Sequence, residues 1–539
     1  MKNILQLTDE LGIDRQYIQP YGWDKAKIDL KYKEELKDKK DGKLVLVTAI
    51  TPTKAGEGKT TTTIGLHDGL RRIGVNSLAC LREPSLGPVW GIKGGAVGAL
   101  KSTIVPSDDI NLHFTGDFHA LTSTINLMAA IIDNHIYQGN ELNIDPNKIS
   151  WKRALDINDR ALRSVTVAQD DKKAIPHHDE FVITVASELM TILTISQTEE
   201  EFVERVNKII VAYTYNNEPI YFGQFNCGKA ILKMMRNAMN PNIVKTLEEN
   251  PVLVHCGPFA NISIGVNSIN ATKMALKMSD VVVTEAGFGA DLGAEKFLDI
   301  KCQLGNLSPD AIVLVTTIRA LKLHGGVKFE DLDKENIEAL KAGYCNLKKH
   351  YENMCTYGVP VIVAINRFPN DTGKEQETLC ELLLSDGIWY SLNRAALDGS
   401  EGAIDLANNV MTAINLDTKH LACYGGFEPL YSFDEPILTK IDKICKEIYG
   451  ASSVECTDLA LEQIKQYEEM GYGNLPVCIS KTPNSLTDNP KILGRPEGFK
   501  IHIREVRLYA GAGLIVPLSG SLLLMPGLPA KPRCLDEFN

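Results

Sequence analysis

The chain has 539 residues, too many for a single compact core, so we expect two to four domains. Its formal net charge is -11 without an offsetting basic stripe, which argues against nucleic acid as a partner. The charged N-terminus is not typical of a secretory signal, and no apolar run approaches the roughly 20 residues that span a bilayer. The 12 cysteines include no CxxC pair and no zinc spacing. We therefore expect a cytoplasmic protein with reduced thiols and no membrane segment.

Residues 1–40 read as short polar helices, and the first strong pattern follows them. Lys43–Ile50 is rich in Val and Ile and has the length of a buried strand, and a loop with one Pro and two Gly comes next. From Lys59, apolar residues recur at helical spacing until Gly74. A strand, a glycine-rich loop and a helix that opens with Gly-Lys-Thr are typical of a phosphate site. Backbone N–H groups and the helix dipole bind the anion there.

This loop supplies the predicted phosphate-binding residues. They are Thr53, Lys54, Ala55, Gly56, Glu57, Gly58, Lys59 and Thr60. Lys59 would pair with the outer phosphates of a nucleotide, and the Thr60 hydroxyl would reach a magnesium ion. Thr53 stands where the common pattern has its first Gly, so a glycine-rich turn without a ligand is the alternative.

Two further loops follow in chain order. The predicted strand Ser77–Leu81 runs into Arg82 and Glu83, at the end of a strand where open α/β sheets bind ligands. The alternative is a surface turn with a solvated ion pair. Gly91–Gly98 is a second glycine-rich loop, for which a plain flexible turn is the simpler interpretation.

Residues 109–119 gather two aspartates and two histidines. These side chains could bind a metal, although their spacing fits no zinc pattern, and polar groups that order a loop are an equal alternative. A predicted helix, Leu121–Ile136, follows them.

Four apolar runs in the second half of the chain each lead into a loop of Gly and polar residues. They are Pro251–His255, Val281–Thr284, Ala311–Thr316 and Val359–Ile365. Such repetition predicts a doubly wound, mainly parallel α/β sheet with its ligand loops on one edge. With the phosphate loop, it predicts a P-loop NTPase-type fold accompanied by two smaller α/β domains. We expect a nucleotide-binding domain from 1–120 and 285–350, a second domain over 121–284 and a C-terminal domain over 351–539.

Several ordered motifs carry a resemblance to a known family. They are TPTKAGEGKTTTTIGL (51–66), LREPSLGP (81–88), INLHFTGDFHA (110–120), VTEAGFGADLGAEKF (283–297), TIRALKLHGG (317–326) and REVRLYAGAG (504–513). Over about residues 10–530 the chain resembles the monofunctional formate–tetrahydrofolate ligases. The resemblance implies ATP-dependent formylation of tetrahydrofolate through formyl phosphate, which yields 10-formyltetrahydrofolate, ADP and phosphate.

The resemblance also implies roles for particular residues. Lys59 and Arg82 would hold formyl phosphate, and Asp117 would orient that intermediate or the accepting amine. Phe368 would stack on the folate ring, with the C-terminal domain contributing to the folate site. ATP and Mg²⁺, a monovalent cation (K⁺ or NH₄⁺) and a homotetramer are likewise implied.

The chain departs from the family pattern at three places. Lys54 replaces a Pro, and Val97–Lys101 replaces two glycines and an aromatic residue. Ala396 stands where the family has the tryptophan that covers the second face of folate, and Trp389 could substitute only through a shifted loop. Two alternatives therefore stay open: a diverged paralogue that binds ATP but has weak or altered folate activity, and a P-loop NTPase that acts on a protein partner.

Overall fold

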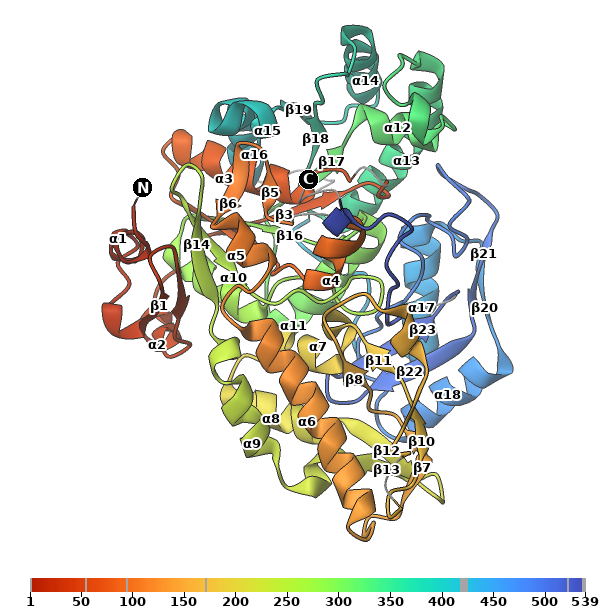
Figure 1. The fold of residues 1–539 in the computed structure, drawn as a ribbon. Coiled ribbons are helices and arrows are strands. Elements are labelled where there is room, and N and C mark those ends of the chain that lie inside the picture. Colours follow the sequence, from red (N-terminus) through yellow and green to blue (C-terminus); the bar gives the residue numbers. More distant parts are fainter. Residues whose placement is uncertain are drawn as a thin grey trace.

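The computed structural model describes residues 2–53, 56–93, 96–169, 172–416, 425–520 and 523–535. The protein is built around one large, mostly parallel sheet (Figure 1). Along its main path the strands are, in spatial order, β1 (Ile18–Tyr21), β2 (Lys25–Ile28), β14 (Asn242–Thr246), β15 (Pro251–Val254), β4 (Ser77–Leu81), β16 (Val281–Glu285), β3 (Lys43–Ala49), β17 (Ala311–Thr316), β18 (Val361–Asn366) and β19 (Tyr390–Asn393). Off this path, β6 (Ser102–Val105) pairs with β14, and β5 (Gly98–Ala99) pairs with β6. Neighbouring strands from β15 to β19 are all parallel. The predicted mixed α/β fold with a mainly parallel sheet is therefore confirmed.

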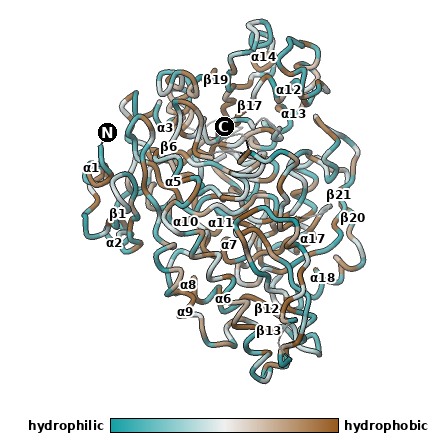
Figure 2. Tube along the Cα trace, in the orientation of Figure 1, coloured by the Kyte–Doolittle hydropathy of each residue, from teal (hydrophilic) through white to brown (hydrophobic). Residues whose placement is uncertain are grey.

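Helices cover both faces of this sheet. One face packs α3 (Lys59–Arg72) and α16 (Ile404–Ile414) against Val45, Val283 and Val313. The opposite face packs α10 (Ile269–Met278), α12 (Ile318–His324) and α13 (Ile337–Cys355). Because both faces are covered, β17 is buried at every residue, which explains its continuous apolar sequence. Figure 2 shows β17 in brown, whereas the surface helix α8 (Glu199–Asn207) is mainly teal.

The N-terminal segment differs from the prediction of polar helices alone. Short helices α1 (Ile4–Glu10) and α2 (Tyr32–Leu36) are present, but β1 and β2 form a hairpin between them. This hairpin joins the sheet edge through antiparallel pairing with β14. Strand β2 has the sequence KAKI, whose alternation is too short to distinguish a strand from a loop, so the pairing with β14 decides its structure.

A second layer lies below the sheet in Figure 1. It combines α6 (Asp117–Tyr137), α7 (Glu188–Ile195), α8 (Glu199–Asn207) and α9 (Gly228–Met235) with a small sheet of β13 (Pro219–Tyr221), β12 (Ile210–Thr214) and β7 (Ile144–Ile149). The predicted helix Leu121–Ile136 is part of α6. Two further short pairs are β8 (Arg153–Ala154) with β11 (Phe181–Val182) and β9 (Val165–Val167) with β10 (His177–Asp179).

The C-terminal part, blue in Figure 1, contains two small strand pairs. They are β20 (Ser453–Cys456) with β21 (Lys500–Ile503) and β22 (Glu505–Tyr509) with β23 (Leu514–Leu518), accompanied by α17 (Ile437–Lys443) and α18 (Asp458–Glu469). Arg504 separates β21 from β22, so the apolar run around residues 501–506 is divided between two strand pairs. The division into three domains stays a prediction; the central sheet takes β18 and β19 from the range assigned to the third domain. Within the described residues, no helix has the length and apolar character needed to cross a membrane.

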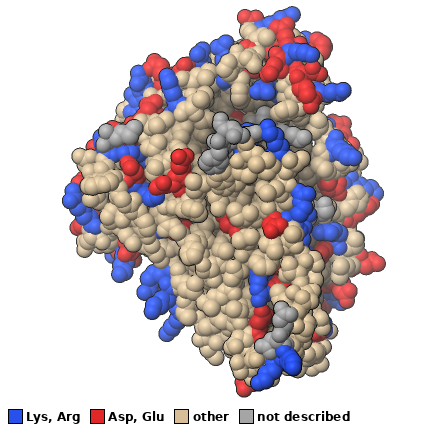
Figure 3. Space-filling view, in the orientation of Figure 1, with Lys and Arg blue, Asp and Glu red and all other residues tan. Residues whose placement is uncertain are grey.

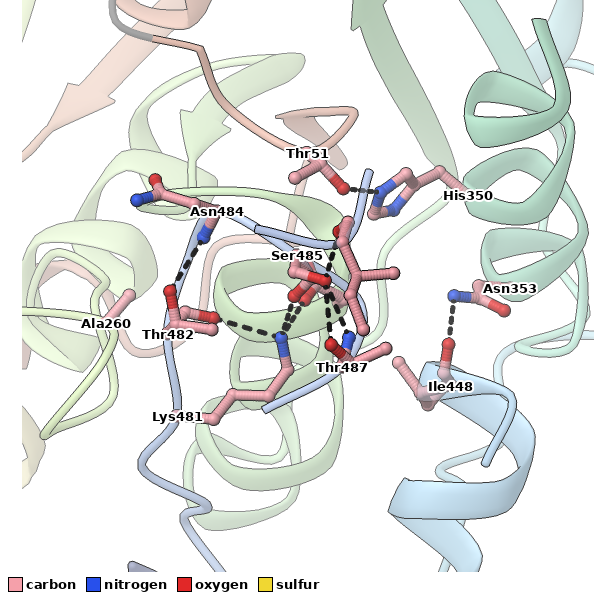
Figure 4. Close-up of polar contacts among 12 residues, drawn as sticks. Thr51, Ala260, His350, Asn353, Ile448, Lys481, Thr482, Asn484, Ser485 and Thr487 are labelled. Atoms are coloured by element: carbon pink, nitrogen blue, oxygen red, sulfur yellow. Dashed lines mark hydrogen bonds and ion pairs between the residues drawn. The ribbon is translucent and has the colours of Figure 1, made fainter. Parts of the chain in front are cut away.

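A buried ion pair joins the C-terminal segment to the loop after β16. The Lys481 ammonium lies 2.8 Å from an Asp291 carboxylate oxygen, and both side chains are fully buried. Figure 4 shows Lys481 also directed at the backbone carbonyls of Thr482 and Ser485. With its charge paired and its protons donated, the ammonium is accommodated away from water.

We expect Lys481→Met to destabilise the protein by about 3–5 kcal/mol, because it leaves the Asp291 carboxylate buried without its partner. Lys491→Met, at an exposed lysine ten residues along, is the matched control. Urea unfolding of both variants measures the difference. The double variant Asp291→Asn/Lys481→Met should regain part of the loss, and equal stability of the two single variants would contradict the role of the pair.

Candidate active site

The predicted phosphate loop connects β3 to α3, as the sequence indicates. Gly58 caps α3 with a φ of 77°, and Gly56 has a φ of 74°, so both adopt the left-handed conformation that Gly favours. The buried Glu57 carboxylate accepts a 2.6 Å hydrogen bond from the Thr53 N–H and closes the loop on itself. Lys54 and Ala55, also predicted to bind phosphate, lie outside the described residues.

Helix α13 contacts Thr51, at the start of this loop, through His350 (Figure 4). The Thr51 hydroxyl lies 2.9 Å from His350 Nε2 and accepts a hydrogen bond from Asn346. Burial lowers the pKa of His350 to about 4, so the imidazole is neutral near pH 7. The start of the loop at Thr51 is thus held by hydrogen bonds between uncharged groups.

Lys59 and Arg82 belong to one charged group at the carboxyl edge of the sheet. Burial lowers the pKa of the Lys59 ammonium; Glu57 and Glu285 oppose this shift, whereas the Arg82 guanidinium adds to it. Arg82 Nε lies 3.4 Å from a Glu285 carboxylate oxygen. Two cations held together beside a helix N-terminus form a site suited to a multiply charged anion, because such an anion relieves their repulsion.

Glu285 was not predicted as a site residue. It is the last residue of β16, the strand next to β3, and it is buried. Its carboxylate accepts a 2.7 Å hydrogen bond from the Thr60 hydroxyl. A carboxylate and a hydroxyl are oxygen ligands of the kind that Mg²⁺ prefers. The position of a carboxylate at the end of a predicted strand could have indicated it, but the neighbour relation of β16 and β3 is visible only in the fold.

Glu83 and Asp117 form a separate buried cluster beside Arg82. Lys27 of β2 lies 2.7 Å from Asp117, and Asn242 donates a 2.8 Å hydrogen bond to the same carboxylate. Burial and the neighbouring Asp117 charge raise the pKa of Glu83 well above its usual value. Because Glu83 is buried, the alternative of a solvated surface turn at Arg82–Glu83 is wrong.

The histidines of residues 109–119 do not share a site with these carboxylates. His113 and His119 are exposed, and Asp109 pairs with Lys25. Across the residues that the structure describes, no group of three or more His, Cys, Asp or Glu side chains is placed to hold a metal ion. The aspartates order the loop by binding lysines of the N-terminal hairpin.

Phe368 follows β18 in a turn at the same edge of the sheet. Its N–H donates a 2.7 Å hydrogen bond to Asp371, and the Arg319 guanidinium lies over its ring, 5.5 Å from the centroid. Trp389 is not its counterpart. Trp389 precedes β19, which runs parallel to β18, so it lies at the amino-terminal ends of the strands, whereas Phe368 lies at their carboxyl ends. Trp389 packs against the apolar cluster that includes Leu70.

Comparison with known proteins decides the family. The family model described as formate–tetrahydrofolate ligase matches residues 1–537. This chain belongs to the formate–tetrahydrofolate ligase family. A formate–tetrahydrofolate ligase of Allorhizobium ampelinum is 50% identical to it over 530 residues, which cover 98% of this chain and 94% of the relative. The resemblance predicted from the motifs is confirmed.

Two of the departures from the ligase family pattern lie against each other. The Lys101 N–H donates a 3.1 Å hydrogen bond to the carbonyl oxygen of Ala396. Within the altered loop Val97–Lys101, Leu100 has a φ of 51° and a side chain that is 67% exposed. A leucine in the left-handed region costs about 1 kcal/mol relative to Gly. Of the second glycine-rich loop, residues 94 and 95 lie outside the described residues.

We expect Gly58→Ala to reduce the free energy of unfolding more than Gly74→Ala does. Both glycines flank α3 with positive φ, 77° and 85°, so the backbone strain of about 1 kcal/mol is common to both. A Cβ at Gly58 would lie 2.9 Å from Asn366 Nδ2, whereas one at Gly74 would meet nothing within 4 Å. Thermal unfolding of the two variants measures the difference, and equal losses would show that the contact with Asn366 does not constrain the loop.

Proposed function

We propose that the protein ligates formate to tetrahydrofolate in an ATP-dependent reaction that yields 10-formyltetrahydrofolate, ADP and phosphate through formyl phosphate. The observation that carries this proposal is that the Glu285 carboxylate contacts both Arg82 and Thr60, the neighbour of Lys59, at the predicted phosphate loop of a chain that belongs to this ligase family throughout its length. The strand–loop–helix geometry of β3 and α3 supports the finer assignment to a P-loop NTPase-type fold.

The chemistry explains why this site needs positive charge. Formate is a poor acyl donor because its leaving group would be oxide, and transfer of the ATP γ-phosphoryl group to a formate oxygen provides a good leaving group. The N10 amine of folate then attacks the formyl carbon, the C–O bond to phosphate breaks, and the amine loses a proton. Lys59, Arg82 and the N–H groups of the loop from Thr53 to Thr60 would neutralise the phosphate charge in both steps.

Thr60 and Glu285 are the residues that we infer to hold Mg²⁺, directly or through water. The ion would neutralise charge on the transferring phosphoryl group. The 2.7 Å hydrogen bond between them places a hydroxyl and a carboxylate oxygen side by side at the helix start, which supports this assignment. The monovalent cation, K⁺ or NH₄⁺, is carried over from the family likeness.

For the second half of the reaction we propose roles for Asp117 and Phe368. Asp117 would orient formyl phosphate or the accepting amine, and its fixation by Lys27 and Asn242 supports a positioning role. Phe368 would stack on the folate ring. Since Arg319 covers one face of Phe368, folate would use the other face.

The test is an assay of purified protein with formate, ATP, Mg²⁺ and tetrahydrofolate, in which 10-formyltetrahydrofolate is measured. We expect turnover that falls at least about 100-fold in Lys59→Ala, because a charge that stabilises phosphoryl transfer is removed. Turnover no higher than that of the Lys59→Ala control would contradict the ligase function. ATP binding without turnover would favour a diverged paralogue, and ATP hydrolysis that requires a protein partner would favour the NTPase alternative.

We also propose that the protein acts as a cytoplasmic homotetramer, with α6 in the contact between copies. Figure 3 shows few charged side chains over the middle of the face on which α6 lies. Between Asp117 and Asp133 this helix carries no Asp, Glu, Lys or Arg, although Leu127 is exposed on it. An uncharged helix face with exposed apolar groups is typical of a contact surface, and in a homo-oligomer the same face of a second copy would cover it.

We expect light scattering to give a mass four times the 59.3 kDa of the chain. Leu127→Asp should lower this mass, because a carboxylate would be buried in the contact. Leu384→Asp, on the outer helix α14 (Gly373–Ser385), should leave it unchanged. A monomeric wild-type protein, or equal behaviour of the two variants, would overturn the assignment of α6.

A further inference from the structure

Asn366, the last residue of β18, uses every hydrogen-bonding position of its side chain. Its amide nitrogen donates to the carbonyl oxygens of Glu57 at 2.8 Å and Gly58 at 3.4 Å. Its amide oxygen accepts from the Thr62 hydroxyl at 2.9 Å and from Asn393 Nδ2 at 2.7 Å. An amide can make two donor and two acceptor contacts of this kind, so only Asn fits the position in this form.

These contacts fix the end of the phosphate loop. The Glu57 carbonyl precedes α3, where it lies outside the regular hydrogen bonds of the helix and needs a donor from elsewhere. Thr62 lies one turn into α3, and its hydroxyl, which has a single proton, lies between Asn366 Oδ1 at 2.9 Å and the Gly58 carbonyl oxygen at 3.0 Å. Asn366 therefore contacts both the end of the phosphate loop, at Glu57 and Gly58, and the first turn of α3, at Thr62.

The same asparagine lies at the base of the proposed folate site. Phe368 is two residues further along, and the Arg367 N–H between them donates to the Asn393 carbonyl at 3.0 Å. The Asn393 side chain in turn accepts from the Ala395 N–H at 3.2 Å. Ala396, at the position of the second folate-stacking residue in the family, is the next residue. Both walls of the folate site are thus connected through Asn366 and Asn393 to the phosphate loop.

We propose that Asn366 is a positioning residue that sets the nucleotide site and the folate site relative to each other. Its amide group is engaged by protein groups, so we assign it a positioning role rather than a contact with either substrate. It holds the loop that carries Lys59 and the turn that carries Phe368 in one hydrogen-bonded unit, so that the formyl carbon formed at the loop lies within reach of the amine held at the turn. This inference rests on the proposed function, because it assigns ATP to the loop and folate to Phe368.

The test compares two variants of Asn366. Asn366→Ala removes all four hydrogen bonds. Asn366→Asp keeps the size and shape of the side chain but places an acceptor oxygen against the carbonyls of Glu57 and Gly58, so the two donor contacts are lost. It is the second test variant if Asn366→Ala fails to fold. Asn409→Ala is the matched control, because Asn409 on α16 is also half-buried and donates to Ser391 Oγ of β19, away from the phosphate loop.

Calorimetry with ADP and with folic acid, each titrated into the full-length protein, gives the two dissociation constants. Both Asn366 variants should raise both constants about tenfold, as expected for the loss of hydrogen bonds that order a binding loop. Asn409→Ala should change neither constant. Lys59→Ala should weaken only ADP binding and Phe368→Ala only folic acid binding, since each belongs to one site. In Phe368→Ala/Asn366→Ala the two effects on folic acid should be less than additive.

The outcomes separate this inference from the function on which it rests. Weaker folic acid binding in Phe368→Ala, with unchanged folic acid binding in both Asn366 variants, would overturn the positioning role and retain the folate site. Unchanged folic acid binding in Phe368→Ala would overturn the folate site itself, and the positioning role with it. Weakened ADP binding alone in the Asn366 variants would reduce Asn366 to a support of the phosphate loop and overturn its connection to folate.

Discussion

The parallel pairing of β16, β3, β17 and β18 is the constraint on which the rest of the structure depends. Parallel strands end at a common edge, so residues more than 200 positions apart in the chain come together there. Glu285 and Asn366 each end a strand of this set, and Lys59 begins the helix after another. The sheet thus brings the acidic, amide and basic groups of the site to one loop, and no single segment of the chain contains them all.

Patterns that are local in sequence were predictable, and contacts between distant segments were not. The phosphate loop carries its signal within residues 43–74, because a strand, two glycines and a helix start are adjacent there. That Glu285 and Asn366 lie beside the phosphate loop follows only from the pairing of β16 with β3 and of β18 with β17. Lys27 lies in a four-residue strand whose pairing with β14 is long-range, so neither the hairpin nor its contact with Asp117 could be read from the sequence.

The departures from the family pattern have a common location. Lys101 and Ala396 are hydrogen-bonded neighbours, so changes that are nearly 300 residues apart alter one region of the structure, beside the proposed folate site, rather than two. Leu100 keeps a left-handed backbone without the glycine that relieves it. On Phe368, Arg319 supplies a planar charged group on the ring face opposite to the one proposed for folate.

The buried pair of Lys481 and Asp291 has a consequence for how the chain can be divided. Asp291 follows β16 and acts electrostatically on Lys59, but its partner comes from the C-terminal part of the protein. A fragment that stops before Lys481 would retain every residue predicted to bind phosphate and still carry an uncompensated carboxylate within its core. The part of the chain that contains the predicted phosphate loop is therefore not an autonomous module, and ribosomal synthesis must pass Lys481, about a ninth of the chain from its end, before this part can acquire its final stability.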